Sequence, residues 1–251
     1  MALMDEFKEE RENIKNGTLK QKTAYFWEYY KWYVIVPVII LIVVISYIHH
    51  MMTKTDDVLN GLLINAKSVE AQTLADQLGA DFSKEMKIDT KEYSVSLNTS
   101  LSYMANNPSG MTNYETSQAL MAWIGAGAVD FINSDANTMT ELAYREYFSD
   151  LRDVLSEDNL TQYEPYFLYI DQAVIDARND SLENNQDADT ITLPDCRKPE
   201  TMEKPVPVLI DMSQCKTLTE LYSEKDTLAL GIVSNAPNLD MTLNFLKYLM
   251  K

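Results

Sequence analysis

Histidine is nearly absent from this chain of 251 residues, where the only two, His49 and His50, are adjacent. A Ser-His-Asp or Cys-His catalytic arrangement therefore has no histidine to use anywhere after residue 50. Two cysteines are too few to build a zinc site of cysteine and histidine ligands there. Glycine is also scarce, with seven residues. Neither the phosphate-binding loop G-x-x-x-x-G-K-[ST] nor the dinucleotide-binding motif G-x-G-x-x-G occurs. These absences give no support to catalysis, and we expect a non-enzymatic protein without a cofactor.

Positive charge is in short supply, with 21 Lys and Arg against 38 Asp and Glu. The deficit is uneven along the chain. Residues 1–54 carry seven basic and six acidic side chains, a net of +1, whereas residues 55–251 carry fourteen and thirty-two, a net of −18. So acidic a segment repels phosphate backbones, which argues against nucleic acid as a partner.

One long stretch contains no charge, the seventeen residues from Trp32 to Ile48. With the neutral residues up to Met52 it reaches the roughly 20 residues that a helix needs to cross a bilayer. The 31 residues before it and the lack of a small-x-small cleavage site argue against a cleaved signal peptide. The pattern predicts a single transmembrane helix over residues 32–52, a signal anchor that makes the lipid bilayer a partner.

Aromatic and basic residues flank this stretch in a way that predicts its orientation. Four aromatic side chains are candidates for the headgroup layer: Trp27, Tyr30, Trp32 and Tyr47. Lysines are frequent before the stretch, whereas only Lys54 follows it closely, and the positive-inside rule then places the N terminus in the cytoplasm. We therefore expect a cytoplasmic juxtamembrane segment over 1–31 and an extracellular domain over 58–251.

The residues after 58 alternate between short apolar runs and helical patterns, which is typical of an α/β domain. The first half reads strand, helix, strand, helix, strand, helix, the order of a parallel sheet with right-handed crossovers. We expect a mostly parallel sheet flanked by helices. The predicted strands are Leu59–Asn65, Tyr93–Leu97, Val129–Asn133, Val206–Ile210 and Leu228–Val233, and the predicted helices follow Ser68, Thr112 and Thr138 and cover Tyr169–Arg178 and Met241–Met250.

Cys196 and Cys215 both fall within the acidic segment. In an oxidising compartment they can form a disulfide, which would contribute about 3 kcal/mol by chain entropy at this separation. The alternative is a pair of free thiols.

Two segments near the middle and the end of the chain carry a family resemblance. Leu228–Leu249 reads LALGIVSNAPNLDMTLNFLKYL, and Gly125–Leu155 contains a strand with an aspartate that leads into a helix. Both resemble the extracellular solute-binding proteins of ABC transporters, and the N-terminal stretch is similar to single-pass proteins of Gram-positive anaerobes. The resemblance implies a solute-binding lobe. Typical members are longer, clamp their ligand between two lobes and carry a lipid anchor.

In a parallel sheet, ligands bind beyond the carboxyl ends of the strands. Short polar side chains stand at these ends and could hydrogen-bond a sugar or a peptide: Asn65, Asn98, Ser100, Asn133, Asp135 and Asn235. The same residue types also serve as turn residues and helix caps. Tyr163, Tyr166, Phe167 and Tyr169 could stack on a sugar or belong to the core and its rim.

Two functions are compatible with these patterns. The first is a membrane-anchored extracellular binding protein, such as an accessory to a transporter, which predicts a concave pocket at the strand ends. The second is a non-catalytic structural or assembly subunit of a cell-surface complex with other membrane proteins. It predicts a filled pocket and an exposed apolar patch.

Overall fold

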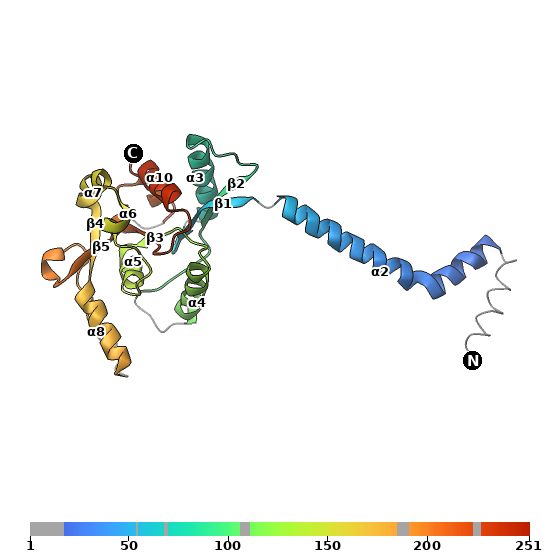
Figure 1. Cartoon of the computed structure of the whole chain (residues 1–251), viewed down its shortest axis with the longest axis horizontal. Coiled ribbons are helices and arrows are strands. Elements are labelled where there is room, and N and C mark those ends of the chain that lie inside the picture. The colour runs from blue at the N-terminus through green and yellow to red at the C-terminus, as the bar shows by residue number, and fades with distance from the viewer. Residues whose placement is uncertain (1–17, 54, 68–69, 106–110, 185–190, 223–226) are drawn as a thin grey trace. The chain divides into compact units, whose positions relative to one another are not determined.

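The computed structural model describes residues 18–53, 55–67, 70–105, 111–184, 191–222 and 227–251 (Figure 1). The chain divides into two compact units, residues 1–54 and residues 55–251. The first contains helix α2, Leu19–Thr53, with Pro37 inside it. The second is an α/β domain built on one six-stranded sheet.

Helix α2 does not match the predicted transmembrane helix. Within the part of the chain that the structure describes, no helix combines the length and the apolar character that crossing a membrane requires. The prediction of a membrane span over residues 32–52 is therefore wrong.

The four aromatic residues predicted at a membrane interface all belong to α2. Trp27 and Trp32 are exposed, at 62% and 64% of their surface. The side chains of Tyr30 and Tyr47 lie outside the described residues, as does the whole of segment 1–17.

The sheet of the second unit has the strand order β2-β1-β3-β6-β5-β4. Its strands are β1 (Asp56–Leu63), β2 (Tyr93–Asn98), β3 (Phe131–Asp135), β4 (Phe167–Asp171), β5 (Pro205–Asp211) and β6 (Leu228–Ile232). The pairings of β1 with β2 and with β3 are parallel, whereas β3–β6, β6–β5 and β5–β4 are antiparallel. The α/β class is as expected, but the prediction of a mostly parallel sheet is wrong, because the sheet is mixed.

The sheet becomes mixed at β6, which runs antiparallel to both of its neighbours, β3 and β5. Only the four-residue helix α9, Lys216–Thr219, lies among the described residues between β5 and β6, and β6 enters the sheet between β3 and β5. Strand β4 lies where the sequence pattern predicted a helix from Tyr169, and helix α8, Gln172–Glu183, begins only after that strand. Short buried runs such as Phe167–Asp171 fit a strand or a helix equally well by periodicity alone.

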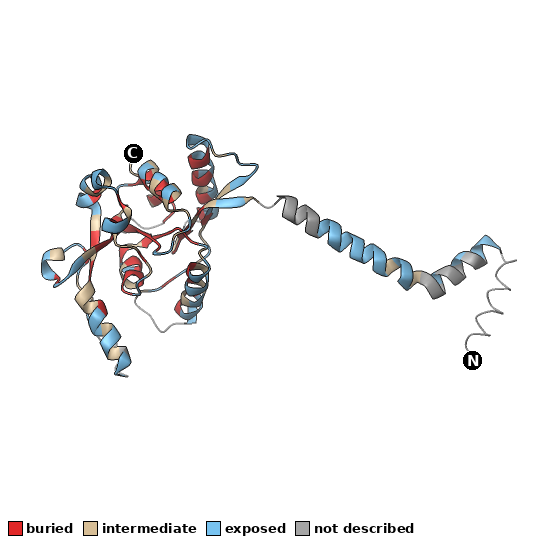
Figure 2. Ribbon diagram, viewed as in Figure 1, coloured by how far each residue is buried: buried red, intermediate tan, exposed pale blue. Residues whose placement is uncertain are grey.

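Helices cover both faces of the sheet, and the buried residues form a layer on each side of it (Figure 2). The remaining helical elements are α3 (Ala71–Glu85), α4 (Met111–Gly125), α5 (Ala136–Ala143), α6 (Leu151–Val154), α7 (Glu157–Tyr163), η1 (Glu164–Tyr166), η3 (Pro199–Thr201) and α10 (Leu239–Leu249). On one face, Leu59 and Phe131 of the strands pack with Phe82 of α3 and Phe245 of α10. On the other face, strand residues such as Ile132 pack with α4, α5 and α8.

The two cysteines belong to different faces of the sheet. Cys196 is buried in the core layer of α4 and α5, whereas Cys215 is buried in the opposite layer with Phe245. Both are free thiols. The predicted disulfide between Cys196 and Cys215 is therefore wrong, because the sheet separates the two side chains. Burial raises the pKa of the Cys215 thiol, which lowers its reactivity at neutral pH.

Candidate functional site

Strands β2, β1, β3 and β5 run in the same direction, so their carboxyl ends share one edge of the sheet. Strand β6 is antiparallel and begins at this edge, where Leu228 pairs with Asp135 and Ala229 with Asp211. We call this edge the C-edge. It corresponds to the place where open α/β sheets bind their ligands.

Asn65 and Asp135, two of the predicted ligand-binding residues, meet at the C-edge. Asn65 Nδ2 donates to Asp135 Oδ2 at 3.0 Å and to the Tyr103 carbonyl at 2.8 Å, while Asn65 Oδ1 accepts from the Tyr103 N–H at 2.8 Å. Asp135 is also the N-cap of α5, because its Oδ1 accepts from the Thr138 N–H at 3.0 Å. In this structure both side chains hold loops and a helix in place.

The pKa of Asp135 reflects these contacts. Burial by itself would raise it, but hydrogen bonds from Thr138, Asn65 and Ser134 outweigh burial, and the pKa lies below its ordinary value. Asp135 is therefore a carboxylate at neutral pH. The contacts of Asp135 are those of a helix cap, the second role that its residue type allowed in the sequence.

The remaining predicted residues at the C-edge are also engaged within the chain. Asn98 Oδ1 accepts from the Ser100 hydroxyl at 2.6 Å and from the Ser100 N–H at 2.8 Å, which forms a local turn after β2. Asn133 is fully buried and donates to the Tyr222 hydroxyl at 2.9 Å. Its Oδ1 has no hydrogen-bond partner among the described residues.

Asn235 does not join this group. It follows β6, which runs against β3, so it lies at the opposite edge of the sheet, where its Nδ2 donates to the Ile124 carbonyl at 2.6 Å. Its neighbour there is the buried Asp130, which binds Asn60 and Asn238. The expectation that Asn235 would share an edge with Asn65 depended on a parallel β6.

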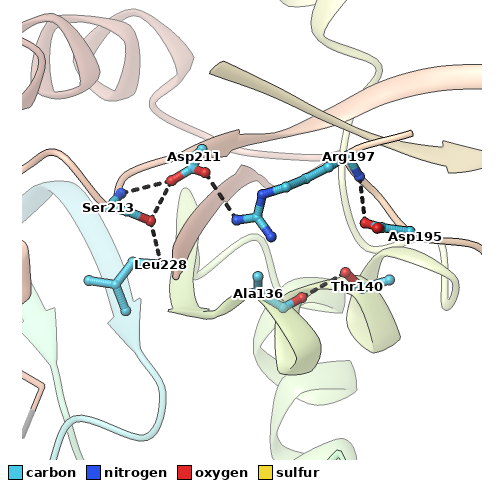
Figure 3. Close-up of polar contacts among 7 residues, drawn as sticks. All are labelled: Ala136, Thr140, Asp195, Arg197, Asp211, Ser213 and Leu228. Atoms are coloured by element: carbon cyan, nitrogen blue, oxygen red, sulfur yellow. Dashed lines mark hydrogen bonds and ion pairs between the residues drawn. The ribbon is translucent and has the colours of Figure 1, made fainter. Parts of the chain in front are cut away.

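A cleft of about 470 Å³ opens at the C-edge beside the start of α5. It is lined by Ala105, by Ala136, Asn137, Thr140 and Glu141 of α5, and by residues 193–197. Figure 3 shows the Arg197 side chain extending toward Asp211 at the end of β5. We call this cleft the Arg197 cleft.

The position of the Arg197 guanidinium is set by the end of β5. Its Nη2 donates to Asp211 Oδ2 at 3.1 Å, and the Ser213 hydroxyl donates to Asp211 Oδ1 at 2.5 Å (Figure 3). Burial would raise the pKa of Asp211, but the hydrogen bonds from Ser213 and Arg197 outweigh it and the pKa is lowered. Asp211 is therefore ionised at neutral pH and holds Arg197, whose side chain remains 44% exposed.

Carboxylates line the other parts of the cleft. Asp195 accepts from the Arg197 N–H at 3.0 Å and pairs with Lys198 at 3.1 Å, and these contacts lower its pKa. Glu141 of α5 is half-buried and has no hydrogen bond or ion pair among the described residues. The cleft thus combines a guanidinium that has spare N–H donors with a carboxylate that has spare acceptors.

The sequence did not single out Arg197, Glu141 or Asp211. Asp211 ends a strand and could have been found by the rule that identified Asp135. Arg197 lies between α8 and η3, outside every predicted strand and helix, and no local pattern marks it. Among the described residues, no group of three or more His, Cys, Asp or Glu side chains is placed to hold a metal ion.

Comparison with known proteins returned no match to a protein-family model, a curated protein or a solved structure. The resemblance to solute-binding proteins therefore rests on the sequence segments alone.

Asp171, at the end of β4, makes the stability of the domain depend on pH. Its carboxylate accepts from the N–H groups of Ala173, Glu203 and Lys204 at 2.8 to 3.0 Å. Burial would raise its pKa, but these donors outweigh burial and lower the pKa. A depressed folded-state pKa stabilises the native state above the unfolded pKa of about 3.9, and this contribution is lost as the pH falls through the folded value.

We therefore expect an Asp171→Asn variant to be less stable than the wild type at pH 7, and the difference to shrink as the pH falls below about 4. Urea unfolding at a series of pH values measures it. A difference that stays constant from neutral to acidic pH would show that the Asp171 charge contributes nothing.

Proposed function

We propose that residues 55–251 form a non-catalytic binding domain of the solute-binding type, which captures a small zwitterionic solute in the Arg197 cleft. An amino acid or a short peptide fits this class. One observation carries the proposal: Arg197 and Glu141, of opposite charge and with unused hydrogen-bonding groups, line the same cleft.

The chemistry of the two groups favours a zwitterion over other solutes. A guanidinium binds a carboxylate with charge-assisted hydrogen bonds, and Asp211 fixes its position before a ligand arrives. Glu141 and Asp195 offer acceptors to an ammonium group. An inorganic anion would meet these carboxylates at close range, and the net charge of −18 on residues 55–251 opposes it further.

The volume of the cleft, about 470 Å³, lies within the usual range of about 300–1,000 Å³ for small-molecule sites. The absence of histidine after residue 50 favours binding over acid–base catalysis at this place.

The test is isothermal titration calorimetry of the full chain against the proteinogenic amino acids and a set of dipeptides. We expect binding by at least one of them, and we expect Arg197→Gln to weaken it by about tenfold or more, because a charge-assisted pair is lost. Lys204→Gln is the matched control, since Lys204 also forms one ion pair, with Asp176, but lies away from the cleft. Equal losses in both variants, or no binding by any member of the panel, would refute the proposal.

A protein-binding role has one observation in its favour. The outer face of α4 exposes Met111, Tyr114 and Met121, at 75%, 61% and 60% of their surface. Their spacing places them along one stripe of the helix, and flexible methionines are common on adaptable docking surfaces. Retention of a partner by the wild type but not by a Met111→Lys, Met121→Lys variant would support an assembly subunit.

A further inference from the structure

A second cleft, of about 300 Å³, lies on the other face of the sheet from the Arg197 cleft. Its walls come from α6, α7 and η1, and its floor comes from the edge strand β4 and its neighbour β5. The residues that matter for its chemistry are Arg152, Thr161, Glu164, Phe167, Tyr169 and Pro207. We call it the Tyr169 cleft.

The floor of the Tyr169 cleft is aromatic. Phe167 and Tyr169 alternate along β4 with Leu168 and Ile170, which point into the core layer of the opposite face. The two rings are 6.5 Å apart at an angle of 73°, and both are half-buried. Pro207 pairs with Tyr169 across the strands and extends this apolar surface.

The rim of the cleft is polar and held in position. Arg152 donates from Nε and Nη2 to both oxygens of Asp150, which fixes the plane of the guanidinium while 55% of the side chain stays exposed. Glu164 and Arg152 both act on the Tyr169 hydroxyl: burial and the Glu164 charge raise its pKa, and the Arg152 charge opposes them. A guanidinium donor and a carboxylate acceptor therefore line the same cleft as the Tyr169 ring and its hydroxyl.

From this arrangement we propose that the Tyr169 cleft is a carbohydrate-binding site that takes a neutral pyranose unit. The electron-rich face of an aromatic ring attracts the C–H face of a sugar, and the ring removes that apolar face from water. Each sugar hydroxyl is both a donor and an acceptor, so the guanidinium of Arg152 and the carboxylate of Glu164 can bind neighbouring hydroxyls. The net charge of −18 on residues 55–251 disfavours acidic sugars.

This site differs from the Arg197 cleft in ligand class and in position. β4 lies between them, and the Tyr169 N–H donates to the Cys196 carbonyl at 2.8 Å, next to Arg197 on the chain. The two proposals can therefore fail separately. Arg197→Gln is expected to leave sugar binding unchanged.

Saturation-transfer difference NMR on the full chain tests the site, with maltotriose, cellotriose and the trimer of N-acetylglucosamine as probes. We expect saturation of the sugar-ring protons in at least one of these probes. We expect Tyr169→Ala to lower the affinity for that probe by about tenfold or more. Tyr166→Ala is the matched control, because Tyr166 is a neighbouring exposed tyrosine that does not line the cleft. Glu164→Gln provides a second variant at an exposed position, which removes the acceptor charge without disturbing the core.

The proposal is overturned if no probe receives saturation at millimolar concentration, or if Tyr166→Ala and Tyr169→Ala weaken binding equally. It is also overturned if Tyr169→Ala stays folded by circular dichroism and binds as the wild type does. Binding of a proline-rich peptide in place of every sugar would assign the aromatic floor to a protein partner instead.

Discussion

Replacing Asp130 with alanine is expected to lower the free energy of unfolding by about 3–5 kcal/mol, because three polar groups lose their acceptor. Asp130 is completely buried, and its carboxylate accepts from the Asn60 N–H at 2.7 Å, the Asn238 N–H at 2.7 Å and Asn238 Nδ2 at 3.2 Å. The contacts join β1, the start of β3 and the turn before α10. Their loss would loosen three elements at once.

Chemical denaturation of the full chain measures this effect, with Asp81→Ala as the control at an exposed aspartate on α3. The control is expected to change stability by no more than about 0.5 kcal/mol. A loss below about 1 kcal/mol in Asp130→Ala would mean that water replaces the carboxylate and that the buried network contributes little.

Asn65→Ala has the second largest expected effect. It should lower the free energy of unfolding by about 3 kcal/mol, because it adds backbone strain and removes hydrogen bonds. Asn65 has a φ of 63°, a conformation that asparagine tolerates and alanine disfavours. Its side chain bridges the end of β1 to Tyr103, Asp135 and Thr138. The substitution removes both contributions.

Asn65→Gly separates the two contributions, because glycine adopts a positive φ without strain. We expect it to be more stable than Asn65→Ala by about 1 kcal/mol, while still losing the hydrogen bonds. Thermal or urea unfolding compares the three proteins. If alanine and glycine give the same stability, strain at Asn65 plays no part.

The α/β class and the first three strands could be predicted because local sequence determines them. Alternating apolar residues and the order of strands and helices from Leu59 to Asp135 contain the information for a parallel β2-β1-β3 unit. Spacing alone accounts for the buried face of α3, because Leu78 and Phe82 are four residues apart and both buried. Met86, one turn further on, is instead exposed beyond the end of the helix.

Long-range features could not be predicted in the same way. The direction of β6 depends on where the chain enters the sheet, and it places Asn235 at the far edge. The sheet also separates Cys196 from Cys215, and no local pattern shows on which face each cysteine lies. The span over 32–52 was inferred from an uncharged run, whereas the structure describes no helix that could cross a membrane. Asp135 shows a further limit, because a helix cap and a ligand residue have the same local sequence.

None of the predicted ligand-binding residues lines the Arg197 cleft. The rule that ligands bind beyond the carboxyl ends of the strands leads to the C-edge, where the Arg197 cleft opens. The predicted asparagine amides at the C-edge form hydrogen bonds within the chain. The hydrogen-bonding groups that remain available to a ligand belong to Arg197 and Glu141. The location of the domain outside the cell and its partners stay predictions.

The most direct test of the central claim is a two-dimensional ¹H–¹⁵N NMR titration of the full chain with the amino acid or dipeptide that binds most tightly. We expect the largest shift changes on the amides of Asn137, Glu141 and residues 195–197. We expect Arg197→Gln to move the midpoint of these changes to a ligand concentration about tenfold higher or more. Shift changes centred instead on Asn235 and the opposite edge of the sheet, or scattered without a centre, would contradict it.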